Sequence, residues 1–151
     1  MKLVFDIETD DLKATKIWCL VAKDIESKQL YTYGPDQIDE GCQLLSEADE
    51  LIGHNIIGFD LPVLRELTRF KTLGYGQKIV DTLVLSRLFD PVREAGHGLG
   101  TWGHKLGSNK IEFKEFSCGF TKEMLEYCIQ DVELNVLVYF ALREESRGFS
   151  R

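Results

Sequence analysis

The sequence contains no run of apolar residues long enough to cross a bilayer, since a membrane-spanning helix needs roughly 20 of them. It also lacks a secretory signal pattern, because Lys2 leads directly into the apolar residues Val4 and Phe5. These two absences exclude the usual sequence features of membrane and secreted proteins. We therefore expect a cytoplasmic protein that has no membrane partner.

Proline and cysteine are both scarce, with 3 and 4 residues in a chain of 151. No two cysteines are closely spaced, which argues against a zinc site or a disulfide framework and predicts reduced thiols in the core at Cys19, Cys42, Cys118 and Cys128. The low proline content and the 44% of hydrophobic residues argue against extensive disorder. A chain of this length is expected to form a single domain over residues 1–151.

Positive charge is in the minority, since 18 Lys and Arg residues face 25 Asp and Glu residues and give a formal net charge of −7. This balance excludes the broad basic surface by which most proteins grip nucleic acid. An acidic protein can still act on nucleic acid if its carboxylates hold divalent cations, because the ions reverse the local charge. One stretch is locally basic and contains Lys105, Lys110 and Lys114.

The hydrophobic pattern predicts strands and helices in a mixed order. Short apolar or alternating segments predict strands at residues 2–8, 16–24, 28–34, 50–55 and 78–81. Cap residues and helical spacing predict helices at about residues 36–47, from 58 onward, and at 81–89, 99–106 and 121–147. The resulting order, β-β-β-α-β-α-β-α-α-α, predicts an α/β fold in which helices surround a mixed sheet.

Two acidic residues interrupt the first predicted strand. Asp6 and Glu8 are two positions apart, so their side chains leave the same face of the strand. Carboxylates on an apolar strand are costly to bury unless they are paired or bind a metal ion. Two interpretations remain open from this pattern alone: a metal site, or a strand end that lies in water.

A third acid, Asp60, follows the strand at residues 50–55 and precedes a helix with Pro62 in its first turn. Aspartate is a favoured helix cap, which is the simplest interpretation of Asp60 and the one we assign to Asp81. The same position also directs a carboxylate out of a helix N-terminus beside the end of a strand. His54 and Asn55, between strand and helix, are ordinary loop residues unless other motifs give them a role.

The last predicted helix carries a phenol and a carboxylate one turn apart. Tyr127 and Asp131 are four residues apart and share one helix face. That face lies beside an apolar stripe that should contact a core, formed by Leu125, Cys128, Ile129, Val132, Val136 and Tyr139. The pair therefore either borders a cleft or is simply solvated.

Taken together and in order, three of these segments resemble the DEDD superfamily of 3′–5′ exonucleases, in the subclass whose last motif carries tyrosine (DEDDy). The segments are residues 5–9 (Phe-Asp-Ile-Glu-Thr), 54–60 (His-Asn-Ile-Ile-Gly-Phe-Asp) and 127–131 (Tyr-Cys-Ile-Gln-Asp). Residues 81–88 and 102–107 resemble the matching parts of the proofreading exonuclease domain of podophage pol I-like (family A) DNA polymerases. The resemblance covers nearly the whole chain.

The resemblance implies a ribonuclease H-like fold, with a five-stranded mixed β-sheet flanked by α-helices. It implies two divalent cations, Mg²⁺ or Mn²⁺, with Asp6 shared by both, Glu8 and Asp131 completing one, and Asp60 holding the second. It also implies that Tyr127 and Glu8 orient the attacking water. Positions that match contacts to the terminal nucleotides are Thr9, Leu12 and Asn55.

The activity implied is hydrolysis of phosphodiesters from the 3′ end of single-stranded or frayed DNA, which releases nucleoside 5′-monophosphates. A DNA polymerase is an implied partner, and for a phage-encoded protein the cytoplasm would be that of a bacterial host. An RNA-trimming enzyme like ribonuclease D or oligoribonuclease is an alternative, because the metal chemistry does not depend on the 2′-hydroxyl. A catalytically inactive binding module is another, against which the presence of all four acids argues.

Three features depart from the pattern of these relatives. Phe59 stands where tyrosine is frequent, and the loop before the last helix is shorter than in the podophage relatives. No polymerase segment follows Arg151, so we expect either a free-standing exonuclease or a domain taken from a longer chain. The shorter loop bears on contacts with DNA rather than on the acids.

Overall fold

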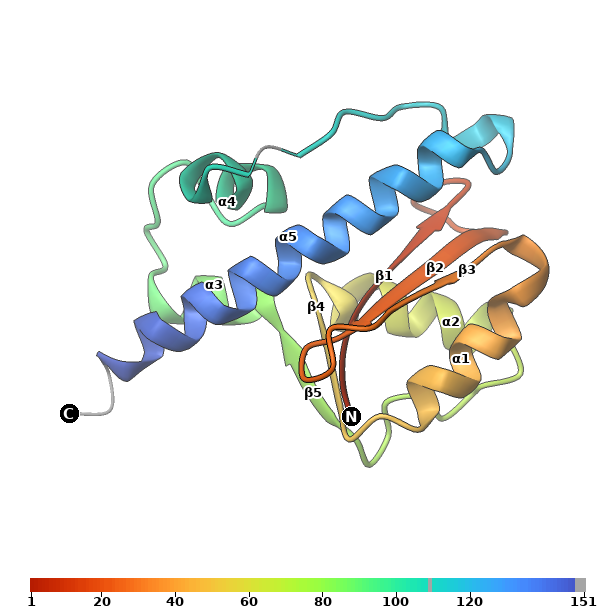
Figure 1. Cartoon of the computed structure of the whole chain (residues 1–151), viewed down its shortest axis with the longest axis horizontal. Coiled ribbons are helices and arrows are strands. Elements are labelled where there is room, and N and C mark those ends of the chain that lie inside the picture. The colour runs from red at the N-terminus through yellow and green to blue at the C-terminus, as the bar shows by residue number, and fades with distance from the viewer. Residues whose placement is uncertain (109, 149–151) are drawn as a thin grey trace.

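The computed structural model describes residues 1–108 and 110–148 (Figure 1). Its five strands form one mixed sheet in the order β3-β2-β1-β4-β5. The strands are β1 (Lys2–Thr9), β2 (Ile17–Asp24), β3 (Leu30–Tyr33), β4 (Glu50–Gly53) and β5 (Lys78–Asp81). β1, β2 and β3 are antiparallel neighbours, whereas β1, β4 and β5 run parallel.

The helices follow the order that the sequence predicts. They are α1 (Ile38–Ser46), α2 (Leu61–Leu67), α3 (Thr82–Phe89), α4 (Leu99–Leu106) and α5 (Lys122–Arg147). The fourth strand is shorter than predicted and ends at Gly53, because the chain turns through Asn55 in the left-handed region, with φ 63°, into a π-helical turn at Ile56–Asp60. Short 3-10 turns occur at Pro35–Gln37 and Phe116–Cys118.

Alternation along β1 separates its apolar and acidic side chains between two layers. Leu3, Phe5 and Ile7 pack in the core that contains α1 and α2, whereas Val4 packs in the core against α5. In Figure 1, α5 crosses the front of the sheet and α2 lies behind it. Because side chains alternate between faces, Asp6 and Glu8 leave the sheet on the side of Val4, toward α5.

The long helix α5 is packed on two sides. The predicted apolar stripe is confirmed, since Cys128, Val132 and Tyr139 are buried against the sheet. A second stripe, which the sequence analysis did not identify, packs against Trp102 of α4 and consists of Leu134, Val138 and Leu142. The helix therefore lies between the sheet and α4.

The cysteine prediction is correct for three of the four thiols. Cys19, Cys42 and Cys128 are buried and free, whereas Cys118 is free but exposed. The prediction is wrong for Cys118 because that residue lies in the surface turn before α5. Among the described residues, no helix combines the length and apolar character that a membrane crossing needs.

Candidate active site

Asp6 lies at the centre of a cluster of acids beside α5. Its carboxyl group forms hydrogen bonds with the carboxyl groups of Glu8 and Asp60. Glu8 is only 8% exposed and Asp6 is half-buried, so the pair does not lie at a strand end in water. The second interpretation of this pair, a solvated strand end, is therefore wrong.

Asp60 reaches β1 across a gap in the sheet. β4 pairs with β1 only from Lys2 to Val4, so it does not extend to the backbone N–H of Ile7. The carboxylate of Asp60 accepts that hydrogen bond at 3.2 Å. Asp60 occupies the predicted N-cap position of α2 but makes no side-chain cap bond, so its carboxylate is used at Ile7 and does not cap the helix.

Asp81 provides the contrast to Asp60. Its carboxylate accepts hydrogen bonds from the backbone N–H groups of Leu83 and Val84, at the start of α3. It also accepts from the N–H groups of Asn55 and Ile57, at 2.8 and 3.0 Å. The assignment of Asp81 to capping is confirmed, and its oxygens are already occupied by backbone donors.

Asp131 enters the cluster from α5. It is 5% exposed, so its interpretation as a solvated helix residue is wrong. Its Oδ2 lies 3.1 Å from the ammonium nitrogen of Lys110, while its buried Oδ1 has no hydrogen-bond partner among the described residues. The sequence analysis noted Lys110 only as part of a basic stretch, and no spacing rule connected it with Asp131, 21 residues along the chain.

Lys110 also fixes the hydrogen-bonding state of Tyr127. Its ammonium group donates to the phenol oxygen and lies 4.1 Å from the centre of the tyrosine ring. The rings of Phe113 and Phe116 contact the same ring, each with a centroid separation of 5.8 Å. An ammonium group can only donate, so the phenol oxygen accepts from Lys110 and the hydroxyl proton is available for another acceptor.

The acids raise one another's pKa because they share a buried space. Burial, followed by the charge of Asp6, raises the pKa of Glu8 to about 11 and that of Asp131 to about 7. Burial raises the pKa of Asp6, and burial together with the charge of Asp6 raises that of Asp60 well above its usual range. Without cations, the cluster is therefore expected to hold protons near neutral pH.

Burial by itself would lower the pKa of Lys110, but the charge of Asp131 and the hydrogen bond to Tyr127 outweigh it and raise that pKa. Lys110 therefore stays charged beside the acids. Its single positive charge cannot balance four carboxylates, which leaves the cluster electrostatically incomplete.

The cluster fits oxygen-seeking divalent cations. Ligand atoms of Asp6, Glu8 and Cys128 all lie within 4.8 Å of one another, and Oδ1 of Asp131 has a free lone pair nearby. Mg²⁺ and Mn²⁺ prefer carboxylate oxygens. The Cys128 thiol instead donates weakly to Asp6, with Sγ 3.7 Å from Oδ2. The carboxylates are therefore the groups that would hold the metal.

Two of the three residues expected to contact substrate line a hollow beside the acids. This terminal hollow, of about 470 Å³, is lined by Glu8, Thr9, Leu12 and Phe59 among others. Leu12 is 87% exposed, and the hydroxyl of Thr9 donates to the carbonyl of Asp11 at 2.9 Å. Asn55 does not line the terminal hollow; it is exposed in the turn after β4.

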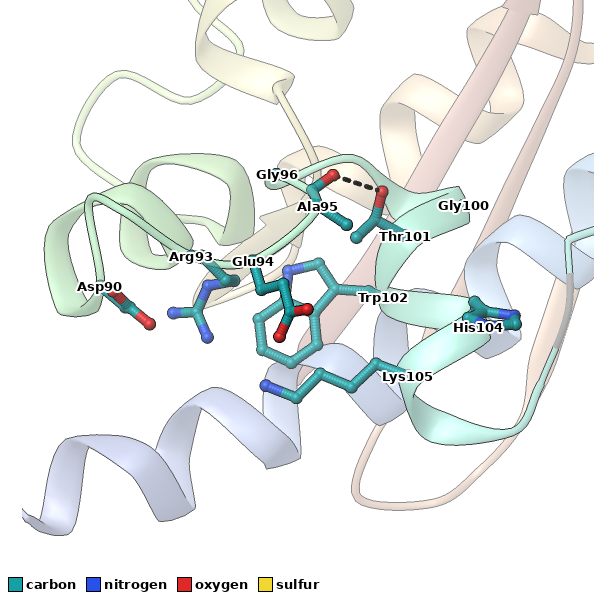
Figure 2. Close-up of a pocket in the computed structure, with 10 residues that line it drawn as sticks. All are labelled: Asp90, Arg93, Glu94, Ala95, Gly96, Gly100, Thr101, Trp102, His104 and Lys105. Carbon is teal, nitrogen blue, oxygen red and sulfur yellow. Dashed lines mark hydrogen bonds between the residues drawn. The ribbon is translucent and has the colours of Figure 1, made fainter.

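Another cavity, of about 710 Å³, lies over α4 and apart from the acids (Figure 2). Its charged lining is balanced, with Arg93 and Lys105 against Asp90 and Glu94. Arg93 is held by an ion pair with Glu145 at 2.9 Å. This α4 cavity therefore offers no excess of either charge.

Comparison with known proteins places the chain beside phage polymerases. The sequence is 29% identical to the DNA-directed DNA polymerase of Enterobacteria phage T3, and the alignment covers 86% of this chain and 25% of the polymerase. Identity to the polymerase of Escherichia phage T7 is 28%, with the same coverage. This chain is homologous to part of these polymerases. It spans about a quarter of their length. No protein-family model matches the sequence.

Solved structures agree on the fold. NrnC of Brucella melitensis with bound Mg²⁺ superposes with a TM-score of 0.72 at 18% identity, over 99% of this chain and 75% of NrnC. Phi29 DNA polymerase, in a complex with primer-template DNA, superposes with a TM-score of 0.56 at 13% identity, over 99% of this chain and 31% of the polymerase. The predicted ribonuclease H-like α/β fold is confirmed.

Proposed function

We propose that this chain is a metal-dependent 3′–5′ exonuclease that removes nucleoside 5′-monophosphates from the 3′ end of single-stranded or frayed DNA. The observation that carries the proposal is the contact of Asp6 with both Glu8 and Asp60, next to the buried Asp131. Acids from strand β1, from the turn before α2 and from the distant helix α5 are costly to bury together, and a pair of cations would offset that cost.

The ligand roles follow from the position of each acid. Asp6, which contacts both Glu8 and Asp60, would hold the cations together with these two acids and Asp131. When bound, such cations lower the pKa of water and stabilise negative charge on the attacking and leaving oxygens of a phosphodiester. The homology to DNA polymerases favours DNA and a role in proofreading.

Tyr127 would act by position rather than as a base. Its ordinary pKa near 10 makes it a poor proton acceptor at neutral pH, and burial raises the pKa of Tyr127 further. Because its oxygen accepts from Lys110, its proton can be donated to a water molecule near Glu8. We propose that this hydrogen bond aligns the attacking water with the phosphorus.

The proposal is tested with 5′-labelled single-stranded DNA and RNA of the same sequence. In Mg²⁺ or Mn²⁺, we expect a ladder of DNA products that shortens from the 3′ end, and EDTA should stop it. Label placed on the 3′-terminal nucleotide should appear at once as a mononucleotide. If the RNA is degraded faster than the DNA, the activity is that of an exoribonuclease instead. Intact DNA and RNA in both metals, or shortening from the 5′ end, would refute it.

Replacing Tyr127 by phenylalanine is expected to lower kcat by roughly tenfold to a hundredfold, because a hydrogen bond to a charged group contributes about 1.5–3 kcal/mol. KM should change little, because the hydroxyl contacts the reacting water rather than the strand. The ring contacts with Phe113 and Phe116 do not need the hydroxyl, so they should persist in Y127F. Any loss of activity would then reflect the missing hydroxyl and not a change of fold. Steady-state kinetics would contradict the orienting role if Y127F lost as much activity as a variant of Asp131.

A further inference from the structure

A second hollow lies on the other side of the loop before α5. It has a volume of about 490 Å³ and is lined by Tyr127, Lys110, Lys114, Phe113 and His104, among others. Lys114 lines both this upstream hollow and the terminal hollow that contains Glu8 and Leu12. The two hollows therefore adjoin at Lys114. Glu8 of the acid cluster lines the terminal hollow, and Lys110, which pairs with Asp131 of the cluster, lines the upstream hollow.

The lining of the upstream hollow suits one nucleotide of a single strand. Lys110 is engaged with Asp131 and Tyr127, which leaves Lys114 and His104 as the groups able to contact a phosphate. Phe113 and Tyr127 contribute ring surface, and among the described residues of the lining Glu112 is the one carboxylate. Proteins that bind single strands combine aromatic stacking surfaces with positive charge in this way.

We propose that the upstream hollow binds the penultimate nucleotide of the substrate, with Lys114 contacting the phosphate on its 5′ side and Phe113 stacking on its base. This inference rests on the proposed exonuclease function and specifies its substrate. The terminal nucleotide lies in the hollow of Thr9 and Leu12, and the bond to be cleaved lies between the two hollows. The minimal full substrate is then a dinucleotide that carries a 5′-phosphate.

The α4 cavity supplies the matched control. His104 lines both that cavity and the upstream hollow, but the side chain of Lys105 extends away from His104 toward Trp102 (Figure 2). The Lys105 nitrogen lies 5.0 Å from the Trp102 ring centre. Lys105 thus carries the same charge as Lys114 in the same basic stretch, yet it does not line the upstream hollow.

Three substrates separate the subsites. The p-nitrophenyl ester of thymidine 5′-monophosphate occupies only the terminal position, because p-nitrophenolate replaces the penultimate nucleoside as leaving group. The dinucleotide TpT adds that nucleoside, and pTpT adds its 5′-phosphate. We expect the wild-type chain to show a KM for pTpT about tenfold below that for TpT, as one phosphate contact of about 1.4 kcal/mol would give.

In Lys114→Ala, the KM ratio of TpT to pTpT should fall to near 1, because the 5′-phosphate of pTpT loses its contact. Lys105→Ala should keep the wild-type ratio. Phe113→Leu should raise the KM of both dinucleotides, because the penultimate base loses its stacking surface.

Two results would overturn the inference. One is an unchanged preference for pTpT in Lys114→Ala. The other is an equal loss on all three substrates, which would place Lys114 at the terminal nucleotide or at the acids. Both results leave the proposed exonuclease function intact, because the wild-type chain still cleaves. If the wild-type chain cleaves none of the substrates, in DNA or RNA form, both the proposed function and this inference are refuted.

Discussion

Replacement of Asp6 by asparagine is expected to lower kcat/KM for strand cleavage by at least about a thousandfold, equivalent to about 4 kcal/mol of transition-state stabilisation. Asp6 contacts Glu8 and Asp60 and lies against Cys128, so no other carboxylate can take its central place. Asparagine has nearly the same shape but carries no charge to hold a cation. Steady-state cleavage of labelled single-stranded DNA measures the effect, and Asp131→Asn should lose activity to a similar degree.

The controls distinguish lost chemistry from lost folding. Without divalent cations, Asp6→Asn should melt at a higher temperature than the wild-type chain, because a neutral amide replaces a buried acid crowded by other acids. Asp49→Asn makes the same chemical change at an exposed residue that pairs with the N-terminus, and it should cleave normally. Normal turnover by Asp6→Asn would refute the assignment of the acids, however stable the variant is.

The thermal stability of the metal-free protein is expected to fall as pH rises from about 5 to about 8. The pKa of Asp131 is 3.8 in a model compound and about 7 in the folded protein. Between these values the folded state holds a proton that the unfolded chain has lost, so the free energy of unfolding decreases with rising pH. Since one pKa unit corresponds to 1.36 kcal/mol and pH 5 lies about two units below the folded pKa, Asp131 accounts for about 3 kcal/mol of this loss.

Other groups and the cations shape this pH profile. The pKa of Glu8, about 11, keeps that group protonated in the folded protein and extends the fall above pH 8. A loss of about 3 kcal/mol would lower the melting temperature by roughly 10 °C in a chain of this size. Mg²⁺ or Mn²⁺ binds the deprotonated carboxylates, so the rise in melting temperature on adding either ion should be larger at pH 8 than at pH 5.

Calorimetry or dye-based melting in EDTA, and then in 10 mM Mg²⁺, measures both effects. Asp6→Asn should flatten the pH dependence and remove most of the response to the ion. A melting temperature that rises with pH in EDTA would show that these acids are ionised and already compensated in the metal-free protein. A cation response equal at pH 5 and pH 8 would show that the ion binds elsewhere.

Local patterns account for how much of the fold could be predicted. Periodicity and cap residues were enough to place α3 (Thr82–Phe89) and α4 (Leu99–Leu106), because the features that begin and end such helices lie within a few residues. The end of β4 was misplaced by two residues. There the chain enters a π-helical turn. The backbone N–H groups of Asn55 and Ile57 stabilise this turn by donating hydrogen bonds to Asp81, which is distant in sequence.

The candidate site, like the fold, could be predicted only in part from local patterns. Local sequence spacing was enough to place Asp6 and Glu8 on one face of a strand. It was also enough to place Tyr127 and Asp131 on one face of a helix. Whether Asp60 caps its helix or reaches Ile7 depended on β4 ending early, and sequence spacing does not show where a neighbouring strand ends. Lys110 was missed for the same reason, since its contacts with Asp131 and Tyr127 join a loop to a helix.

The sequence by itself determined the order of strands and helices, the apolar stripe of α5 and the set of acids to examine, because these follow from backbone periodicity and residue chemistry. Only the tertiary structure decided that the acids meet around Asp6, that α5 is buried on two sides, and that Lys110 and Lys114 lie beside them. Such proximities arise when distant segments pack together, and the free energy of that packing is not encoded in any one segment.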